Sequence, residues 1–244
     1  PVHGPISYRG RVYFAYGSSN HGAVQIVDRD KLLNGEMAPT PENLQAPQIG
    51  RIDMPRYWGG HTAYPMLGMT VAEFGKDSVG RVRDILVVAS ETVRDECDGP
   101  RHPLFLLDIT EPDRPFPVSS FLVPEESGDF CSRGGRFGPH AVQESFDPPY
   151  HGKLLLVSYF NAGIRAVDVR DPFRPVEVGY YIPAVTAGTL PTCYEIGGQR
   201  KCRTVIQTNN VEVDGRGYIY AVDRAGTGLH ILELKGAAAI TGAR

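Results

Sequence analysis

The sequence has no apolar run that approaches the roughly 20 residues needed for a membrane-spanning helix, so we expect no membrane span. It also has little net charge, because 25 lysines and arginines nearly balance 28 aspartates and glutamates to give −3. A chain without a positive excess has no general attraction for nucleic acid or an anionic membrane. We therefore expect neither as a partner.

Several common catalytic motifs are also missing. There is no Gly-x-Ser-x-Gly elbow, no Walker or Rossmann glycine pattern and no His-Glu-x-x-His pair. The usual hydrolase and nucleotide-binding routes therefore have no support. The four cysteines contain no CxxC spacing, which disfavours a zinc site built from thiolates.

What the sequence does contain is one strand that recurs and ends in an acid. Its copies occupy residues 24–28, 104–108, 164–168 and 229–233. Each copy follows another run rich in Val, Ile, Leu, Ala or Tyr and a hairpin tip, a pattern that favours strands separated by turns. The stretch 137–183 holds four such runs without helical period, which is typical of one blade of a β-propeller. We expect the acids Asp28, Asp108 and Asp168 to accept backbone N–H groups of the turn that follows.

The sequence therefore predicts an all-β fold of about four four-stranded antiparallel blades, forming a partial or small propeller. We expect a single domain over residues 1–244, with units at about 1–56, 57–124, 137–183 and 208–244. The small tail 236–244 is either a last edge strand or a frayed terminus. An incomplete last blade exposes edges and apolar faces, so we expect self-association, a partner, or missing blades from a longer chain.

Four segments carry a resemblance to a known family. They are 137–140 (FGPH), 159–175 (YFNAGIRAVDVRDPFRP), 207–211 (QTNNV) and 219–229 (IYAVDRAGTGL). Through them the chain resembles the LVIVD-repeat proteins, which are bacterial and archaeal β-propellers and are often exported. The resemblance implies the propeller fold but no particular activity, because much of the family has no assigned chemistry. Members of that family are usually longer and have more blades.

The cysteines indicate the compartment. Cys193 and Cys202 flank Gly197-Gly198 in a polar loop, and we expect a disulfide between them. Cys97 lies in the long tip 90–103, and Cys131 lies in the connection before His140, so propeller topology brings both to one face, where we expect a second disulfide between them. Two disulfides suit a periplasmic or extracellular protein. Four unpaired thiols in a cytosolic protein are the alternative.

Three histidines and an asparagine begin the innermost strands of the four units. They are His3, His61, His140 and Asn209. In a propeller these positions converge at one mouth of the central channel, where three imidazoles would suit zinc, copper or iron. The alternative is that each histidine bonds to a neighbouring blade and fixes its spacing.

Five further positions are candidates for binding a ligand at the same face. Glu91 lies in an acidic tip and Asp129 in a loop expected nearby, so either could act as a general base or hold a cation. Arg136 belongs to the loop 132–138 (SRGGRFG), which could cradle an anion. Asn209 stands where a fourth histidine would be expected, and Trp58 could form a platform at the rim. Each candidate also has a structural alternative. Glu91 and Asp129 could lie in solvated loops, Arg136 could belong to a flexible connection, and Trp58 could pack within a blade.

Two functions follow from these observations. The first is an exported scaffold that binds a ligand or protein partner through its loop-rich face and channel mouth. The second is a metal-dependent propeller enzyme, an oxidase or hydrolase, with a histidine-bound ion at that mouth. The sequence alone does not choose between them.

Overall fold

Five antiparallel sheets form the fold in the computed structural model, which describes residues 2–17, 22–71 and 80–236. Blade 1 contains β1 (Ile6–Tyr8), β2 (Arg11–Tyr16), β3 (Ala23–Asp28) and β4 (Gln48–Asp53). Blade 2 contains β5 (Thr62–Thr70), β6 (Val82–Ala89), β7 (Leu104–Asp108) and β8 (Phe116–Phe121).

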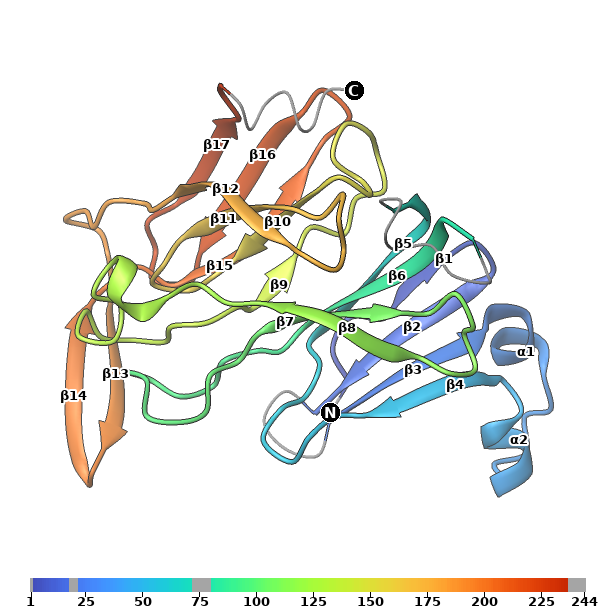
Figure 1. Ribbon diagram of the computed structural model, residues 1–244. Helices are drawn as coiled ribbons and strands as arrows, with labels where there is room; N and C mark the ends of the chain where they lie inside the picture. Colours follow the sequence, from blue (N-terminus) through green and yellow to red (C-terminus); the bar gives the residue numbers. More distant parts are fainter. Residues whose placement is uncertain (1, 18–21, 72–79, 237–244) are drawn as a thin grey trace.

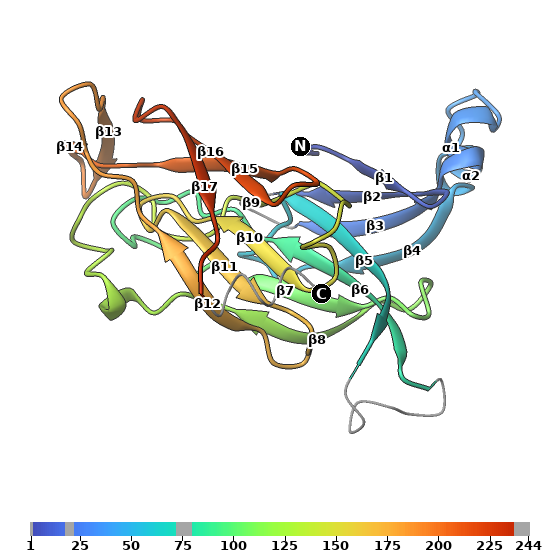
Figure 2. The ribbon, with the colours of Figure 1, turned by 90° about the horizontal axis from the view of Figure 1, so that it is seen from above.

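The second half of the chain repeats this plan. Blade 3 contains β9 (Ala141–Val142), β10 (Leu154–Ser158), β11 (Ile164–Asp168) and β12 (Val176–Tyr181). Blade 4 contains β15 (Thr208–Val213), β16 (Tyr218–Asp223) and β17 (Leu229–Glu233). A separate hairpin of β13 (Pro191–Ile196) and β14 (Gln199–Thr204) lies between the last two blades in sequence. The four blades form the propeller arrangement seen in Figures 1 and 2, which confirms the predicted fold class.

The recurring strand is the third strand of every blade, β3, β7, β11 and β17. In the first three blades its pairing with the outer strand shifts register at the same place, between Ile26 and Val27, Leu106 and Leu107, and Ala166 and Val167. The bulge thus falls just before the terminal acid each time. A repeated bulge of this kind bends the outer edge of each blade in the same way.

The terminal acids cap the turns that follow, as predicted. Asp108 accepts a hydrogen bond from the Thr110 backbone N–H at 2.8 Å, and Asp168 accepts one from Arg170 at 3.0 Å. Asp28 accepts from the Lys31 N–H at 2.9 Å and is the N-cap of a short helix, α1 (Arg29–Asn34). A second helix, α2 (Pro41–Gln45), completes this insertion in blade 1. Neither helix was expected from the sequence.

Hydrophobic cores join three successive pairs of blades, because alternate residues of each strand face opposite neighbours. On β6, Leu86 packs toward blade 1 while Val87 packs toward blade 3. On β10, Leu155 packs toward blade 2 while Leu156 packs toward blade 4. Within the described ranges no such core joins blade 4 to blade 1.

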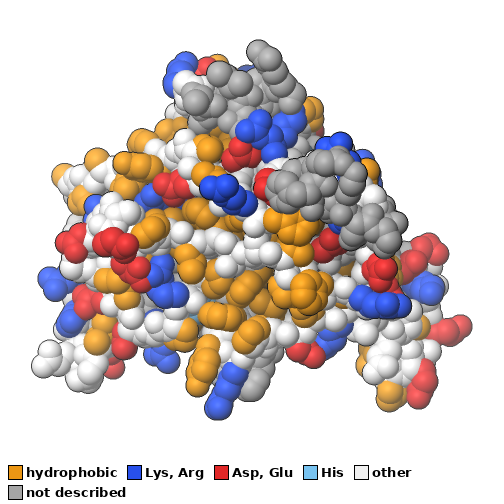
Figure 3. All heavy atoms as spheres, viewed as in Figure 1, with side chains coloured by type: hydrophobic (Ala, Val, Ile, Leu, Met, Phe, Trp, Pro, Cys, Tyr) orange, Lys and Arg blue, Asp and Glu red, His pale blue; other side chains and the backbone are white. Residues whose placement is uncertain are grey.

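The face of blade 4 that points away from blade 3 carries three exposed apolar side chains that the described residues leave uncovered. Leu229 and Ile231 are 60% and 62% exposed, and Val222, on the same face, is also exposed. The tail 236–244 was expected to be either a last edge strand or a frayed terminus, and its residues 237–244 lie outside the described residues. On the side shown in Figure 3, acidic and basic side chains are interspersed with apolar ones and form no large patch of one sign.

Both expected disulfides are present. Cys97 bonds to Cys131, and Cys193 bonds to Cys202 across β13 and β14. Gly197 and Gly198 form the hairpin turn with φ of 59° and 75°, a conformation that glycine adopts without strain. The described helices include none that is long and apolar enough to cross a bilayer.

Candidate functional site

The structure brings His3, His61 and His140 into one row at the beginning of the inner strands. His61 directly precedes β5, His140 directly precedes β9, and His3 lies three residues before β1. The ring centroids of His3 and His61 are 4.2 Å apart, as are those of His61 and His140. Residues separated by up to 137 positions in sequence thus meet at one point.

Glu91 joins this row from the tip that follows β6. Its carboxylate and ligand nitrogens of His3 and His61 all lie within 4.8 Å of one another. The Nε2 atom of His140 is 3.9 Å from the Oε1 atom of Glu91. We call these four residues the histidine cluster. His140 and Glu91 are buried, whereas His3 and His61 are partly exposed, so the cluster is open on one side.

The hydrogen bonds of His140 fix its tautomer. Its Nδ1 atom lies 2.5 Å from the backbone carbonyl oxygen of Asn209. Because a carbonyl can only accept, Nδ1 must carry the proton, and in the neutral imidazole Nε2 is left with a lone pair. That lone pair lies on the side of Glu91. A backbone partner on the remote nitrogen is how proteins commonly orient a metal-binding histidine.

Burial keeps the imidazoles of His61 and His140 neutral. It lowers the pKa of His61 to about 3, and the neighbouring His140 and His3 lower it further. Burial also lowers the pKa of His140, although the Glu91 carboxylate opposes this. Neutral imidazole is the form that binds metal ions, so no proton has to be displaced from these rings at neutral pH.

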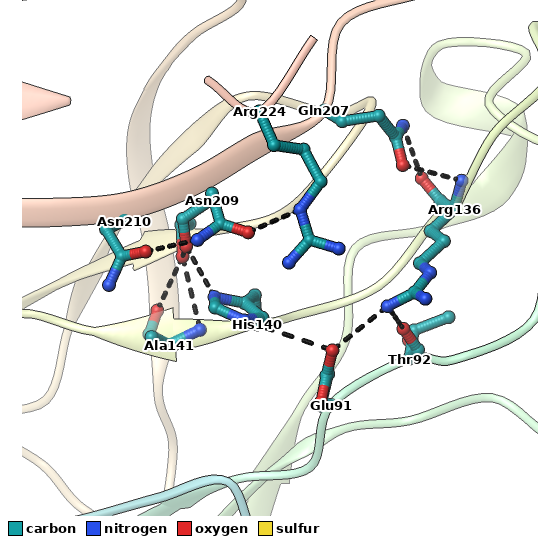
Figure 4. Close-up of polar contacts among 10 residues, drawn as sticks. Glu91, Thr92, Arg136, His140, Ala141, Gln207, Asn209, Asn210 and Arg224 are labelled. Atoms are coloured by element: carbon teal, nitrogen blue, oxygen red, sulfur yellow. Dashed lines mark hydrogen bonds and ion pairs between the residues drawn. The ribbon is translucent and has the colours of Figure 1, made fainter. Parts of the chain in front are cut away.

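Arg136 holds Glu91 in place. Its Nη1 atom donates to the Glu91 carboxylate at 3.0 Å, and its backbone N–H donates to the Gln207 side chain at 3.0 Å. Figure 4 shows Arg136 reaching Glu91 from the connection that leads into blade 3. A carboxylate has two oxygens, so this ion pair leaves Glu91 acceptor capacity for another partner.

Blade 4 contributes Asn209 and Arg224. Asn209 offers its backbone oxygen to His140 and its side-chain oxygen to Arg224, whose Nε donates at 2.6 Å. Sequence reasoning did not single out Arg224. The repeat itself could have indicated Arg224. It follows the second strand of its blade, β16, just as Glu91 follows the second strand of blade 2, β6.

Trp58 and Asp129 were also candidates, and the structure places them in other contacts. The Trp58 Nε1 donates to the backbone oxygen of Arg101 at 2.7 Å, and its ring lies 5.3 Å from that of Phe105. Asp129 is exposed, and its backbone oxygen accepts a hydrogen bond from Ser132. The structure thus gathers Glu91, Arg136 and Asn209 around the histidines.

These observations define a class of protein: a four-blade β-propeller whose inner strands begin at a cluster of imidazoles and one carboxylate. A scan against protein-family models and a search of curated proteins both gave no match for the chain.

Proposed function

We propose that this protein is an exported β-propeller that binds one transition-metal ion in the histidine cluster. The observation that carries the proposal is the approach of His3, His61 and Glu91, whose ligand atoms lie within 4.8 Å of one another. Two histidines and one carboxylate form the donor set of many non-heme iron(II) sites and of some catalytic zinc sites. His140 offers a fourth donor, through the lone pair on its Nε2 atom.

The surroundings of the cluster support this assignment. Neutral imidazoles, a fixed His140 tautomer and a buried carboxylate are the states in which these side chains bind a cation. Copper also accepts imidazole ligands, so iron, zinc and copper are the ions to test. When bound, such an ion supplies Lewis-acid activation of water or one-electron chemistry, the basis of a hydrolase or an oxidase.

The proposal also covers the cellular compartment of the protein and the family to which it belongs. Two disulfides are compatible with a periplasmic or extracellular location. The recurring acid-terminated strand and its repeated bulge support membership of the LVIVD-repeat propellers. We propose one domain over residues 1–244, with the units given above.

Metal analysis of protein purified without an affinity tag tests the proposal. We expect about one equivalent of iron, zinc or copper, bound natively or after reconstitution. The variants His61→Ala and Glu91→Gln should lose it. His230→Ala is the matched control, because His230 bonds to Thr227 in blade 4 and does not belong to the cluster.

A second candidate is a metal-free scaffold that binds a ligand or protein through its loop-rich face. The observation that favours it is the rigid fixation of the long loops by the Cys97–Cys131 bond and by Glu96, which binds Lys201 at 2.7 Å. Preformed loops lose little entropy on binding. Folded wild-type protein that takes up none of the three ions would exclude the metal proposal and leave this one.

A further inference from the structure

Two guanidinium groups border the histidine cluster. The Cζ atoms of Arg136 and Arg224 lie 5.4 and 5.1 Å from the centre of the Phe160 ring. The His140 ring is 5.3 Å from the same ring. In Figure 4 both guanidiniums extend toward the space beside His140 and Glu91. We call Arg136 and Arg224 the arginine pair.

The two arginines differ in how their donors are used. Arg136 donates to Glu91 and to the backbone oxygen of Thr92. Arg224 uses Nε for Asn209, and within the described ranges its two terminal amino groups have no hydrogen-bond partner. The carboxylate of the preceding Asp223 is occupied, because it accepts the backbone N–H groups of Gln207 and Ala225 at 2.7 Å each. The two terminal amino groups of Arg224, which we call its free edge, therefore offer hydrogen-bond donors at the open side of the cluster.

A bound metal would leave the charges near the cluster unbalanced. The arginine pair carries two positive charges, which Glu91 and Asp223 oppose: Glu91 pairs with Arg136, and Asp223 precedes Arg224 in the chain and attracts it electrostatically. A divalent ion would add two positive charges, and Glu91, already paired with Arg136, does not balance them. A charge held in the cluster is stabilised by a counter-charge close to it.

We infer that the cluster binds a small anion, a carboxylate or phosphate group, whose oxygens reach the free edge of Arg224. A guanidinium presents two parallel N–H groups that match the two oxygens of such a group. If a metal ion were held in the cluster, a further oxygen of the same anion would be available to it as a ligand. The metal-dependent part of this inference rests on the proposed function, but the contact with Arg224 does not.

The Arg224→Gln variant tests the inference. Arg224 is exposed, so its replacement leaves the fold intact. Arg216→Gln is the matched control: Arg216 is also an exposed arginine of blade 4, and its Cζ lies 5.1 Å from the ring of Tyr218, but it pairs with Asp214. Binding of inorganic phosphate and of acetate is measured by calorimetry at one fixed ionic strength. Each protein is titrated after chelator treatment and again after metal loading.

We expect wild-type protein to bind at least one of the two probes in the chelator-treated form. Arg224→Gln should weaken that binding roughly ten-fold or more, because a charge-assisted contact is lost. Arg216→Gln should stay within about two-fold of wild type, as expected for a remote, screened charge. The preferred probe, phosphate or acetate, identifies the ligand class.

Three outcomes would overturn the inference. They are no binding of either probe in any form, an equal loss in both variants, and an unchanged affinity in Arg224→Gln. If metal analysis fails but the chelator-treated protein binds a probe through Arg224, the metal proposal falls and the anion inference stands.

Discussion

Glu91 and Arg136 form an ion pair of 3.0 Å that connects the tip of blade 2 to the entry of blade 3. The connection is reinforced along the backbone, where Thr92 donates to Pro139 and Glu96 donates to Gly135. Glu91 is therefore held between two blades. Its negative charge is compensated by the guanidinium of Arg136, which also borders the proposed metal position.

The ion pair predicts opposite effects of Arg136→Gln on stability and on metal affinity. Without metal, the variant leaves the buried Glu91 carboxylate unpaired and should lose about 3 kcal/mol of unfolding free energy. Adding metal should recover more stability in the variant than in wild type, because the carboxylate is freed and binding stabilises the folded state. Urea unfolding with and without the ion measures both. Arg51→Gln, which breaks the exposed pair with Asp53, should cost less than about 1 kcal/mol. Equal metal stabilisation of both variants would contradict the prediction.

A pH dependence follows from His102, which is buried and bonds to Ser90 at 3.0 Å. Burial lowers the pKa of His102 from 6.5 to about 4. Between these values the unfolded chain binds the proton and the folded chain does not, so folding stability falls as pH falls. The loss should approach roughly 3 kcal/mol below pH 4, since each pKa unit is worth about 1.4 kcal/mol.

Comparing wild type with His102→Gln isolates the contribution of His102 to the pH dependence of the unfolding free energy, because the other groups titrate in both proteins. Urea unfolding at pH 8 and at pH 5 should show a smaller loss in the variant. Identical losses would show that His102 does not titrate as expected.

The Cys97–Cys131 bond should stabilise the fold and the site together. Its sequence separation is 34, against 9 for Cys193–Cys202. By chain entropy these loops correspond to about 4 and about 3 kcal/mol of unfolding free energy. Replacing Cys97 and Cys131 by serine should also weaken metal binding, because Cys97 lies in the tip that carries Glu91. The matched pair of serines at Cys193 and Cys202 should leave metal affinity nearly unchanged.

The apolar face of blade 4 predicts self-association. A face that exposes Leu229, Ile231 and Val222 together resembles the faces that pack between the other blades. Sedimentation should show a concentration-dependent dimer or larger species, and Leu229→Glu with Ile231→Lys should shift it to monomer. Leu33→Glu, at an equally exposed leucine of α1, serves as the control. A stable wild-type monomer at all concentrations would contradict this prediction.

Much of the fold could be predicted because its signals are local. Period-two runs and the acid before each turn place the third strands, and the Gly197-Gly198 turn places the β13–β14 hairpin. The two short helices also had local signals that were not used: Asp28 and Thr40 are N-caps, and Pro41 opens α2.

The site could be predicted only in part. The register of the repeat brought His3, His61 and His140 to one end of the inner strands. The role of Arg224 depends on the side-chain directions of Asn209 and Phe160, which lie on different blades. The tautomer of His140 depends on a backbone oxygen 69 residues away. Neither is encoded in a local pattern, so both required the three-dimensional structure.

We expect the β13–β14 hairpin to respond to ionic strength separately from the blades. All residues of its two strands are at least partly exposed, so it has no apolar core of its own. It is attached to the tip of blade 2 through Glu96, which binds Tyr194 at 2.6 Å and Lys201 at 2.7 Å. Salt screens such surface pairs and scarcely affects apolar burial. Concentrated salt should therefore release this arm, seen as faster amide exchange in residues 191–204, while the blades stay folded.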